Sequence, residues 1–260
     1  MTAKPARAAA PRGGALSAKS VAALRREIRS RLEDASEARV REGLAIVCPG
    51  AEVIGVRVPK LRALAAAFRK ERPDLGLDAA LELADAQWAT RVRDEILFAI
   101  FFVARFGRAM RDVPWVRIER WLDAIDNWET CDQLANNVAA AIVDAHPELE
   151  TRVLKLAASR NVWRRRFTLA LASSLNHAGR RHPAFALAAA EALFFDDAPI
   201  VRKAVGWAVR EACRHDADGA YRLLAKHAAR LHPTVLREAG EKLSAAQRAE
   251  LLRRREGAKR

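Results

Sequence analysis

The chain has 260 residues, in which 46 Lys and Arg outnumber 32 Asp and Glu, giving a formal charge of +14. This excess of positive charge favours an acidic polymer as the partner. The three cysteines are isolated and lack the paired spacing of disulfide frameworks or metal sites, and no run of 18 apolar residues could span a membrane. We therefore expect a cytoplasmic protein without metal, cofactor or membrane segment.

Residues 1–16 contain basic and small residues but lack the apolar core of a secretory signal. We expect a disordered basic tail here, with an organellar transit peptide as the alternative. Helical periodicity begins near Ser17, where apolar residues start to recur every three or four positions. Pro and Gly then indicate a loop over CPGAEVIGVRVP, after which Pro59 is placed to open the next helix.

From Pro59 onward, helical segments alternate with short turns that contain Pro, Asp or Gly, and nothing indicates a strand. Comparable segments recur at intervals of about 35 residues, which is typical of paired-helix repeats. The repeat positions share a polar residue near the start of each helix: Arg93, Glu129, Arg165, Arg202 and Arg237. The sequence predicts an all-α, HEAT-like helical-repeat solenoid, an α-α superhelix with a concave basic face, over residues 17–255, followed by a basic tail at 256–260.

The clearest basic stretch lies between Ser159 and Arg181, which contains six arginines and no carboxylate. Arginine runs are often only solvated helix faces. The absence of neighbouring acids favours phosphate binding here, with Arg164, Arg165 and Arg166 opening a helix just after Trp163.

Aromatic, acidic and basic residues share helix faces in two of the repeats. Trp128 and Asp132 are four residues apart, and Trp207 precedes Arg210 by three. If the repeats align as their period implies, one patch on the concave face gathers five side chains: Trp128, Asp132, Arg166, Trp207 and Arg210. Trp88, Trp115, Trp121 and Trp163 are instead expected to pack in the core or between helices.

Three stretches carry a specific resemblance: NWETCDQLANNVAAAIVDAHPELE, AASRNVWRRRFTLAL and IVRKAVGWAVREACRH. Together they resemble the AlkD-type family of DNA alkylation-repair glycosylases. The resemblance implies that Asp132 is the catalytic carboxylate and that Trp128 and Trp207 are the site aromatics. It also implies DNA contacts by basic residues, which we expect to be Arg166 beside the lesion and Arg210, Arg165, Arg164, Lys203 and Arg202 around it. Family members have a further site aromatic in the N-terminal repeat, where this chain has GLAIVCPG.

The implied activity is that of a monofunctional DNA glycosylase, a hydrolase that removes cationic N3- or N7-alkylated purines from duplex DNA. An alkylated purine is already a good leaving group, so the carboxylate would stabilise the cationic sugar and orient water. Indole faces attract cations by about 0.5 to 2 kcal/mol each. We expect a monomer that acts without flipping the lesion into a deep pocket.

Other functions fit parts of the sequence. The main alternative is a non-catalytic HEAT-like protein that binds damaged or branched DNA. A protein-binding scaffold is typical of helical solenoids in general, but it gives no reason for Trp128, Asp132 and Trp207. A nuclease is the weakest alternative, because no cluster of carboxylates at metal-ligand spacing accompanies Asp132.

Overall fold

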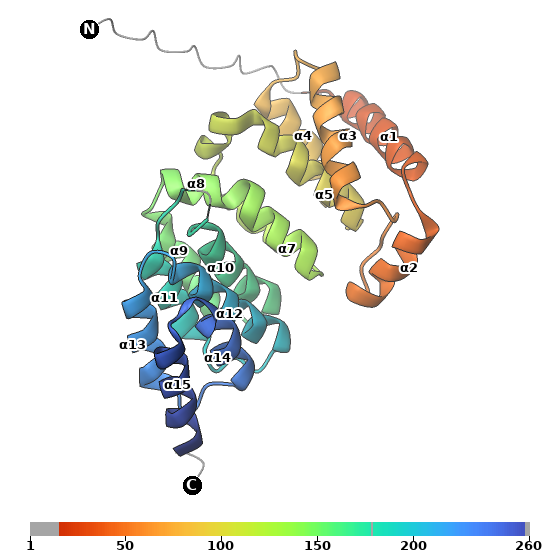
Figure 1. Cartoon of the computed structure of the whole chain (residues 1–260). Coiled ribbons are helices and arrows are strands. Elements are labelled where there is room, and N and C mark those ends of the chain that lie inside the picture. The colour runs from red at the N-terminus through yellow and green to blue at the C-terminus, as the bar shows by residue number, and fades with distance from the viewer. Residues whose placement is uncertain (1–15, 178, 258–260) are drawn as a thin grey trace, which may run out of the picture. The chain divides into compact units, whose positions relative to one another are not determined.

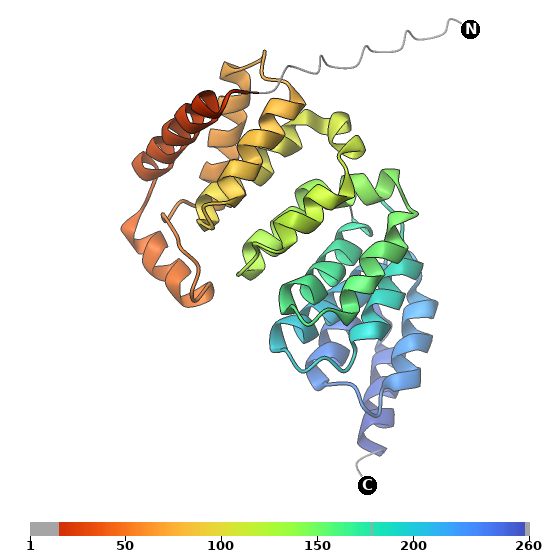
Figure 2. The same ribbon diagram turned by 180° about the vertical axis from the view of Figure 1, so that it is seen from behind.

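The computed structural model describes residues 16–177 and 179–257. Throughout these residues the chain forms helices and loops, and the one β-type contact is a parallel bridge between Glu52 and Val92 (Figures 1 and 2). The predicted all-α class is confirmed. The expected tail at 1–16 lies outside the described residues except for Leu16, as do residues 258–260 of the expected C-terminal tail.

The chain divides into two compact units, Met1–Thr130 and Cys131–Arg260. Helix α7 contains the boundary between them. The single repeat domain over 17–255 stays a prediction, and no helix in the described part of the chain is long and apolar enough to cross a membrane. The elements of the N-terminal unit are α1 (Ala18–Asp34), α2 (Ala38–Val47), α3 (Val58–Glu71), α4 (Leu77–Trp88), α5 (Arg93–Val103), the 3-10 segment η1 (Ala104–Asp112), α6 (Trp115–Leu122) and the start of α7 (Trp128–Leu134).

The core of the N-terminal unit is built around α5, whose eleven residues are all buried. Its run ILFAIFFV is apolar on every side, which is the pattern of a helix enclosed by others. Phe68 of α3 packs edge-on against Phe98 and Phe102 of α5, with ring centroids 5.6 and 5.3 Å apart. Three of the expected core tryptophans are confirmed as buried: Trp88, Trp115 and Trp121.

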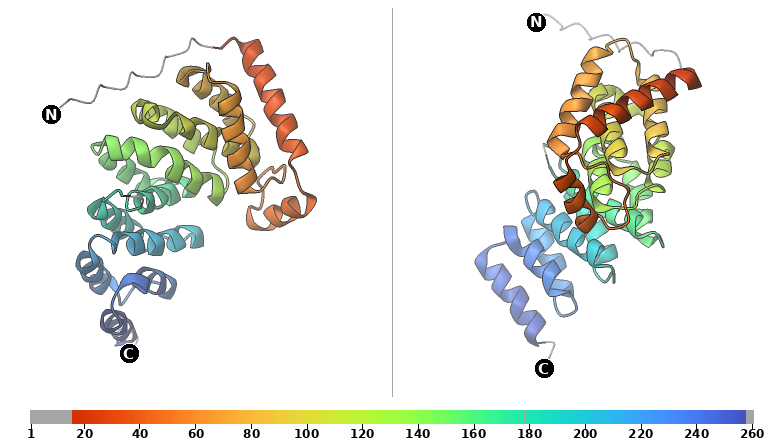
Figure 3. Two further views of the ribbon diagram at one scale, coloured as in Figure 1. Left: turned by 45° about the horizontal axis from the view of Figure 1, so that its top comes forward. Right: turned by 90° about the vertical axis from the view of Figure 1, so that its right-hand side faces the viewer.

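Helix α1 begins where the sequence predicts it, because the Ser17 hydroxyl caps it by accepting a hydrogen bond from the Ser20 backbone N–H at 3.1 Å. It buries Ile28 and Leu32 and packs against α4 and α5. The right-hand view of Figure 3 shows α1 running across the other helices of this unit. Helix α2 is different, because none of its residues is buried.

The C-terminal unit stacks alternate helices in chain order, α10 against α12 and α12 against α14. Gly206 of α12 permits the closest approach, since a Cβ at this position would lie 2.6 Å from Cβ of Glu238 on α14. The elements of this unit are the rest of α7, the π-helical turn η2 (Ala135–Ala139), α8 (Ala140–Ala145), α9 (Leu149–Leu154), η3 (Lys155–Ala158), α10 (Val162–Ser174), α11 (Pro183–Leu193), α12 (Pro199–Ala212), α13 (Ala217–His227), α14 (Pro233–Ala239), η4 (Gly240–Lys242) and α15 (Ala245–Gly257).

Candidate functional site

Helix α7 carries two of the predicted site residues, Trp128 at its first position and Asp132 one turn later. Asn127 caps the helix, with its side-chain oxygen accepting hydrogen bonds from the backbone N–H groups of Glu129 at 3.1 Å and Thr130 at 3.0 Å. This cap is buried, so the start of α7 is fixed by local hydrogen bonds rather than left to fray.

In the C-terminal unit, Asp132 forms a two-point ion pair with Arg166 of α10. Nε and Nη2 of Arg166 donate to the two carboxylate oxygens at 3.0 and 2.7 Å. Asp132 is 9% exposed and Arg166 is 6% exposed. Such a planar, bidentate pair fixes the orientation of both side chains. The structure therefore brings together two of the residues that the sequence predicts for one site.

Arg166 also connects this pair to α12. Its Nη1 donates to the backbone carbonyl oxygen of Ile200, near the start of that helix, at 2.7 Å. A guanidinium has five N–H donors, and these contacts use three of them. The predicted phosphate contact of Arg166 stays a prediction. The geometry adds a role that the sequence does not reveal, which is to hold Asp132 in place.

Cys131 is fully buried beside Asp132 in the chain. Burial raises the pKa of its thiol well above the ordinary value, and the nearby Asp132 charge acts in the same direction. The Cys131 thiol donates a weak hydrogen bond to the carbonyl oxygen of Trp163 at 3.7 Å. A thiol that stays protonated is a poor nucleophile, so Cys131 acts as a packing residue, and Asp132 stays the candidate for chemistry.

Trp207 lies on α12, seven residues beyond Ile200 and therefore about 10 Å further along the helix axis. Its side chain is half-buried. It shares its helix with the carbonyl that Arg166 binds, while its convergence with Asp132 stays a prediction.

Besides Arg166, two more of the predicted DNA-binding arginines have carboxylate partners inside the protein. Arg210 donates to Glu238 of α14 at 2.6 Å and to Glu241 at 3.0 Å. Arg165 binds Asp196 through Nε at 2.6 Å and also donates to the carbonyl oxygen of Ser159 at 3.0 Å. These contacts give both residues a role in joining neighbouring helices, and their predicted DNA contacts stay predictions.

The remaining basic residues predicted to contact DNA are more open. Lys203 is exposed, and Arg202 and Arg164 are half-buried. Within the described ranges, neither Lys203 nor Arg202 has an ion-pair partner. They are the residues of the predicted set that are best placed to meet an outside anion.

In the N-terminal unit, the indole of Trp128 is 36% exposed, and its Nε1–H donates to the carbonyl oxygen of Val47 at 3.0 Å. Val47 ends α2, and it and Ile46 are 52% and 79% exposed. The segment GLAIVCPG, which lacks the family aromatic, therefore contacts Trp128 through its backbone and adds two exposed aliphatic side chains beside it.

A buried ion-pair network that the sequence does not identify as part of the site supports the start of α7. Arg93 donates to Glu129 at 2.8 and 2.5 Å and to Asp94 at 2.9 Å. Asp94 in turn accepts hydrogen bonds from the backbone N–H groups of Ile54 and Val56, both at 2.8 Å. The repeat spacing in the sequence aligns Arg93 with Glu129, but it does not show that the two side chains are in contact.

In the described part of the chain, no three His, Cys, Asp or Glu residues are grouped so that they could hold a metal ion. The C-terminal unit instead offers a fixed carboxylate at Asp132 and open cations on α12, and the N-terminal unit offers an exposed indole at Trp128.

Comparison with known proteins identifies the family of the chain and a solved structure with a similar fold. The family model described as DNA alkylation repair enzyme matches residues 28–243. No curated protein matches the chain by sequence. Among solved structures, a predicted DNA alkylation repair enzyme from Enterococcus faecalis is similar with a TM-score of 0.67 and 17% identity, covering 81% of this chain and 97% of that one. The chain belongs to the DNA alkylation repair enzyme family.

Proposed function

We propose that this protein is a monofunctional DNA glycosylase that excises positively charged N3- and N7-alkylated purines from duplex DNA. The observation that carries the proposal is the Asp132 carboxylate, which Arg166 holds by two hydrogen bonds on the helix that begins with Trp128. A carboxylate fixed in this way needs no reorganisation when positive charge develops next to it.

In the proposed reaction, the bond between C1′ of the sugar and the purine nitrogen breaks, and its electron pair leaves with the base. Because the alkylated base begins with a positive charge, it departs neutral and needs little help from a general acid. Asp132 stabilises the cationic sugar and orients the water whose oxygen attacks C1′. The proton of that water passes to Asp132 or to solvent, leaving an abasic site.

Trp128 and Trp207 favour the cationic lesion and the cationic sugar through their indole faces. Cation–π attraction of this kind is worth about 0.5 to 2 kcal/mol per ring, so the two together discriminate against neutral bases. The exposed indole of Trp128 fits this role, and its hydrogen bond to Val47 fixes the plane of its ring. Lys203 and Arg202 would neutralise backbone phosphates near the lesion.

The test is single-turnover release of free 3-methyladenine and 7-methylguanine from methylated duplex DNA. Asp132→Asn removes the charge while keeping the size of the side chain, and we expect release to fall by about 100-fold or more. Asp218→Asn is the matched control, since Asp218 is exposed on α13. Release that survives Asp132→Asn at the wild-type rate would contradict the proposal.

A second candidate is a non-catalytic protein that binds damaged or branched duplex DNA. It is favoured by one feature, the aliphatic pair Ile46 and Val47 beside Trp128 where the family has an aromatic residue. Tight, salt-sensitive binding of methylated duplex without any base release would select this candidate. For either function we expect a cytoplasmic protein. We also expect a monomer, which gel filtration with light scattering would test.

A further inference from the structure

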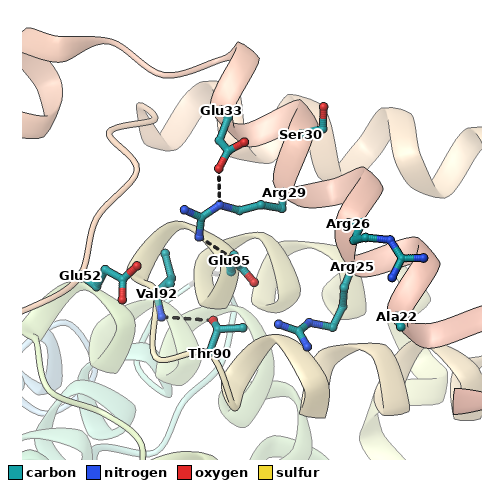
Figure 4. A pocket seen from close by; sticks show the side chains of 10 residues that line it. All are labelled: Ala22, Arg25, Arg26, Arg29, Ser30, Glu33, Glu52, Thr90, Val92 and Glu95. Carbon is teal, nitrogen blue, oxygen red and sulfur yellow. Dashed lines mark hydrogen bonds and ion pairs between the residues drawn. The ribbon is translucent and has the colours of Figure 1, made fainter. Parts of the chain in front are cut away.

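A cavity of about 560 Å³ lies within the N-terminal unit, and its lining residues include neither Asp132 nor Arg166. Its first wall is one face of α1, and its second wall comes from the turn between α4 and α5 and the neighbouring loop (Figure 4). The residues that matter here are Arg25, Arg26 and Arg29 on the first wall and Glu52, Thr90 and Glu95 on the second.

The three arginines of α1 differ in their partners. Arg29 donates to Glu33 at 2.6 Å and to Glu95 at 3.0 Å, so its charge is balanced inside the protein. Within the described ranges, Arg25 and Arg26 have no carboxylate partner. Nε of Arg25 is buried without any acceptor. Buried donors nearly always have a partner, so Arg25 lacks an expected hydrogen bond. Arg26 is exposed and is the second lining arginine without a carboxylate partner, among three arginines and three glutamates in all.

The turn that contributes Thr90 and Val92 to the second wall is held by local hydrogen bonds. Arg91 has a φ of 59°, the left-handed region that costs a non-glycine residue about 1 to 3 kcal/mol. The hydroxyl of Thr90 stabilises this turn by donating to the carbonyl oxygen of Gln87 at 2.8 Å and accepting from the N–H of Val92 at 3.2 Å. Arg91 is exposed, so the turn presents a third positive charge next to the cavity.

We propose that Arg25 and Arg26 bind a backbone phosphate of the duplex that the proposed glycosylase acts on, with Arg91 adding positive charge on the neighbouring turn. The inference rests on the proposed function. A phosphodiester carries one negative charge and accepts hydrogen bonds from several guanidinium donors at once. Glu52 has no ion-pair partner in the described residues and limits how much negative charge the cavity accepts.

The chain itself limits how far this phosphate lies from the lesion. Glu52 lines the cavity, and Val47, five residues earlier, holds the indole of Trp128. Five residues span at most about 18 Å, and one strand of B-DNA advances about 3.4 Å per nucleotide. The Arg and Trp side chains and the width of the cavity add to this span, so the bound phosphate is within about ten nucleotides of the base that meets Trp128.

The experiment measures the affinity for undamaged duplex DNA as a function of KCl concentration, by fluorescence anisotropy. We expect Arg25→Ala/Arg26→Ala to reduce the slope of log K against log [KCl] by about one relative to wild type. Arg222→Ala/Lys242→Ala removes the same charge from exposed positions of the C-terminal unit and should leave the slope unchanged. Arg26→Ala alone, at an exposed position, gives the same test if the double variant does not fold.

A second arm locates the contact by replacing single phosphates with neutral methylphosphonates. A neutral phosphate at the contacted nucleotide, within the distance from the lesion given above, should weaken binding by the wild-type protein. The same replacement should not further weaken binding by Arg25→Ala/Arg26→Ala, which has already lost this contact. Glu52→Gln should strengthen binding. Equal salt slopes for wild type and the double variant would overturn the proposal, and so would equal losses at every neutral phosphate. Absence of base release by wild type would refute the glycosylase but would leave this salt-slope result standing.

Discussion

Replacing Arg166 by Met removes the guanidinium that binds Asp132 and leaves a carboxylate that is only 9% exposed. Breaking a buried ion pair from one side costs about 3 to 5 kcal/mol, because the remaining charge is out of water without its partner. We expect Arg166→Met to lower the free energy of unfolding by that amount. Arg222→Met, at an exposed position of α13, should have little effect.

The double variant Asp132→Asn/Arg166→Met tests whether this cost comes from the unpaired charge. Replacing both partners of a buried pair by neutral groups is often close to neutral for stability. The double variant should therefore be more stable than Arg166→Met alone, with a coupling energy of about 0.5 to 3 kcal/mol. It should nevertheless release no alkylated base, since the carboxylate is gone. Stability would return without activity.

Urea unfolding followed by circular dichroism gives the four free energies of this cycle, and single-turnover base release gives the activities. Arg166→Met keeps the carboxylate but not its position, so we expect slow release rather than none. Additivity of the two substitutions within about 0.5 kcal/mol would refute the reasoning, because it would mean that the two side chains do not interact.

The other predictions concern the surroundings of the site. Trp128→Phe keeps a ring but loses the hydrogen bond to Val47, so α2 should exchange its amide hydrogens faster, and stability should fall by about 1 kcal/mol or less; unchanged exchange would show that α2 is held elsewhere. Gly206→Ala places a Cβ 2.6 Å from Glu238 and should destabilise by about 1 to 3 kcal/mol, which thermal unfolding measures. The Cys131 thiol, whose pKa is raised by burial, should resist iodoacetamide at about pH 8 until urea exposes it, because only the thiolate reacts; rapid labelling of native protein would contradict its burial.

Helix positions and the buried tryptophans were predictable because they depend on local patterns. Ser17 caps α1, Pro59 lies in the first turn of α3, and Trp88 is buried as expected. These features follow from capping chemistry, from proline geometry and from the spacing of apolar residues along one chain segment.

Contacts between helices were less predictable, because a helical face does not specify which neighbour it meets. Asp132 and Arg166 are 34 residues apart, and their pairing agrees with the repeat spacing. The same reasoning places Arg210 on one patch with Asp132, which stays a prediction, but it does not identify Glu238 and Glu241 as the partners of the Arg210 guanidinium. Which carboxylate an arginine reaches depends on how the helices are rotated against each other, and periodicity does not fix that rotation.

Helix α2 shows a further limit of sequence patterns. Its apolar residues Ile46 and Val47 indicate burial, yet both are exposed and α2 has no buried residue. The helix is attached through polar contacts instead, including the hydrogen bond from Trp128 to Val47 and one from Arg41 to the carbonyl oxygen of Ile54 at 3.1 Å.

The most direct test of the central claim is single-turnover release of 7-methylguanine from a duplex that contains it at one position. Wild-type protein should release the free base and leave an abasic site, while Asp132→Asn should bind the same duplex and release it about 100-fold more slowly or not at all. Equal release by the two proteins, or no release by wild type that binds the duplex tightly, would contradict a glycosylase that depends on Asp132.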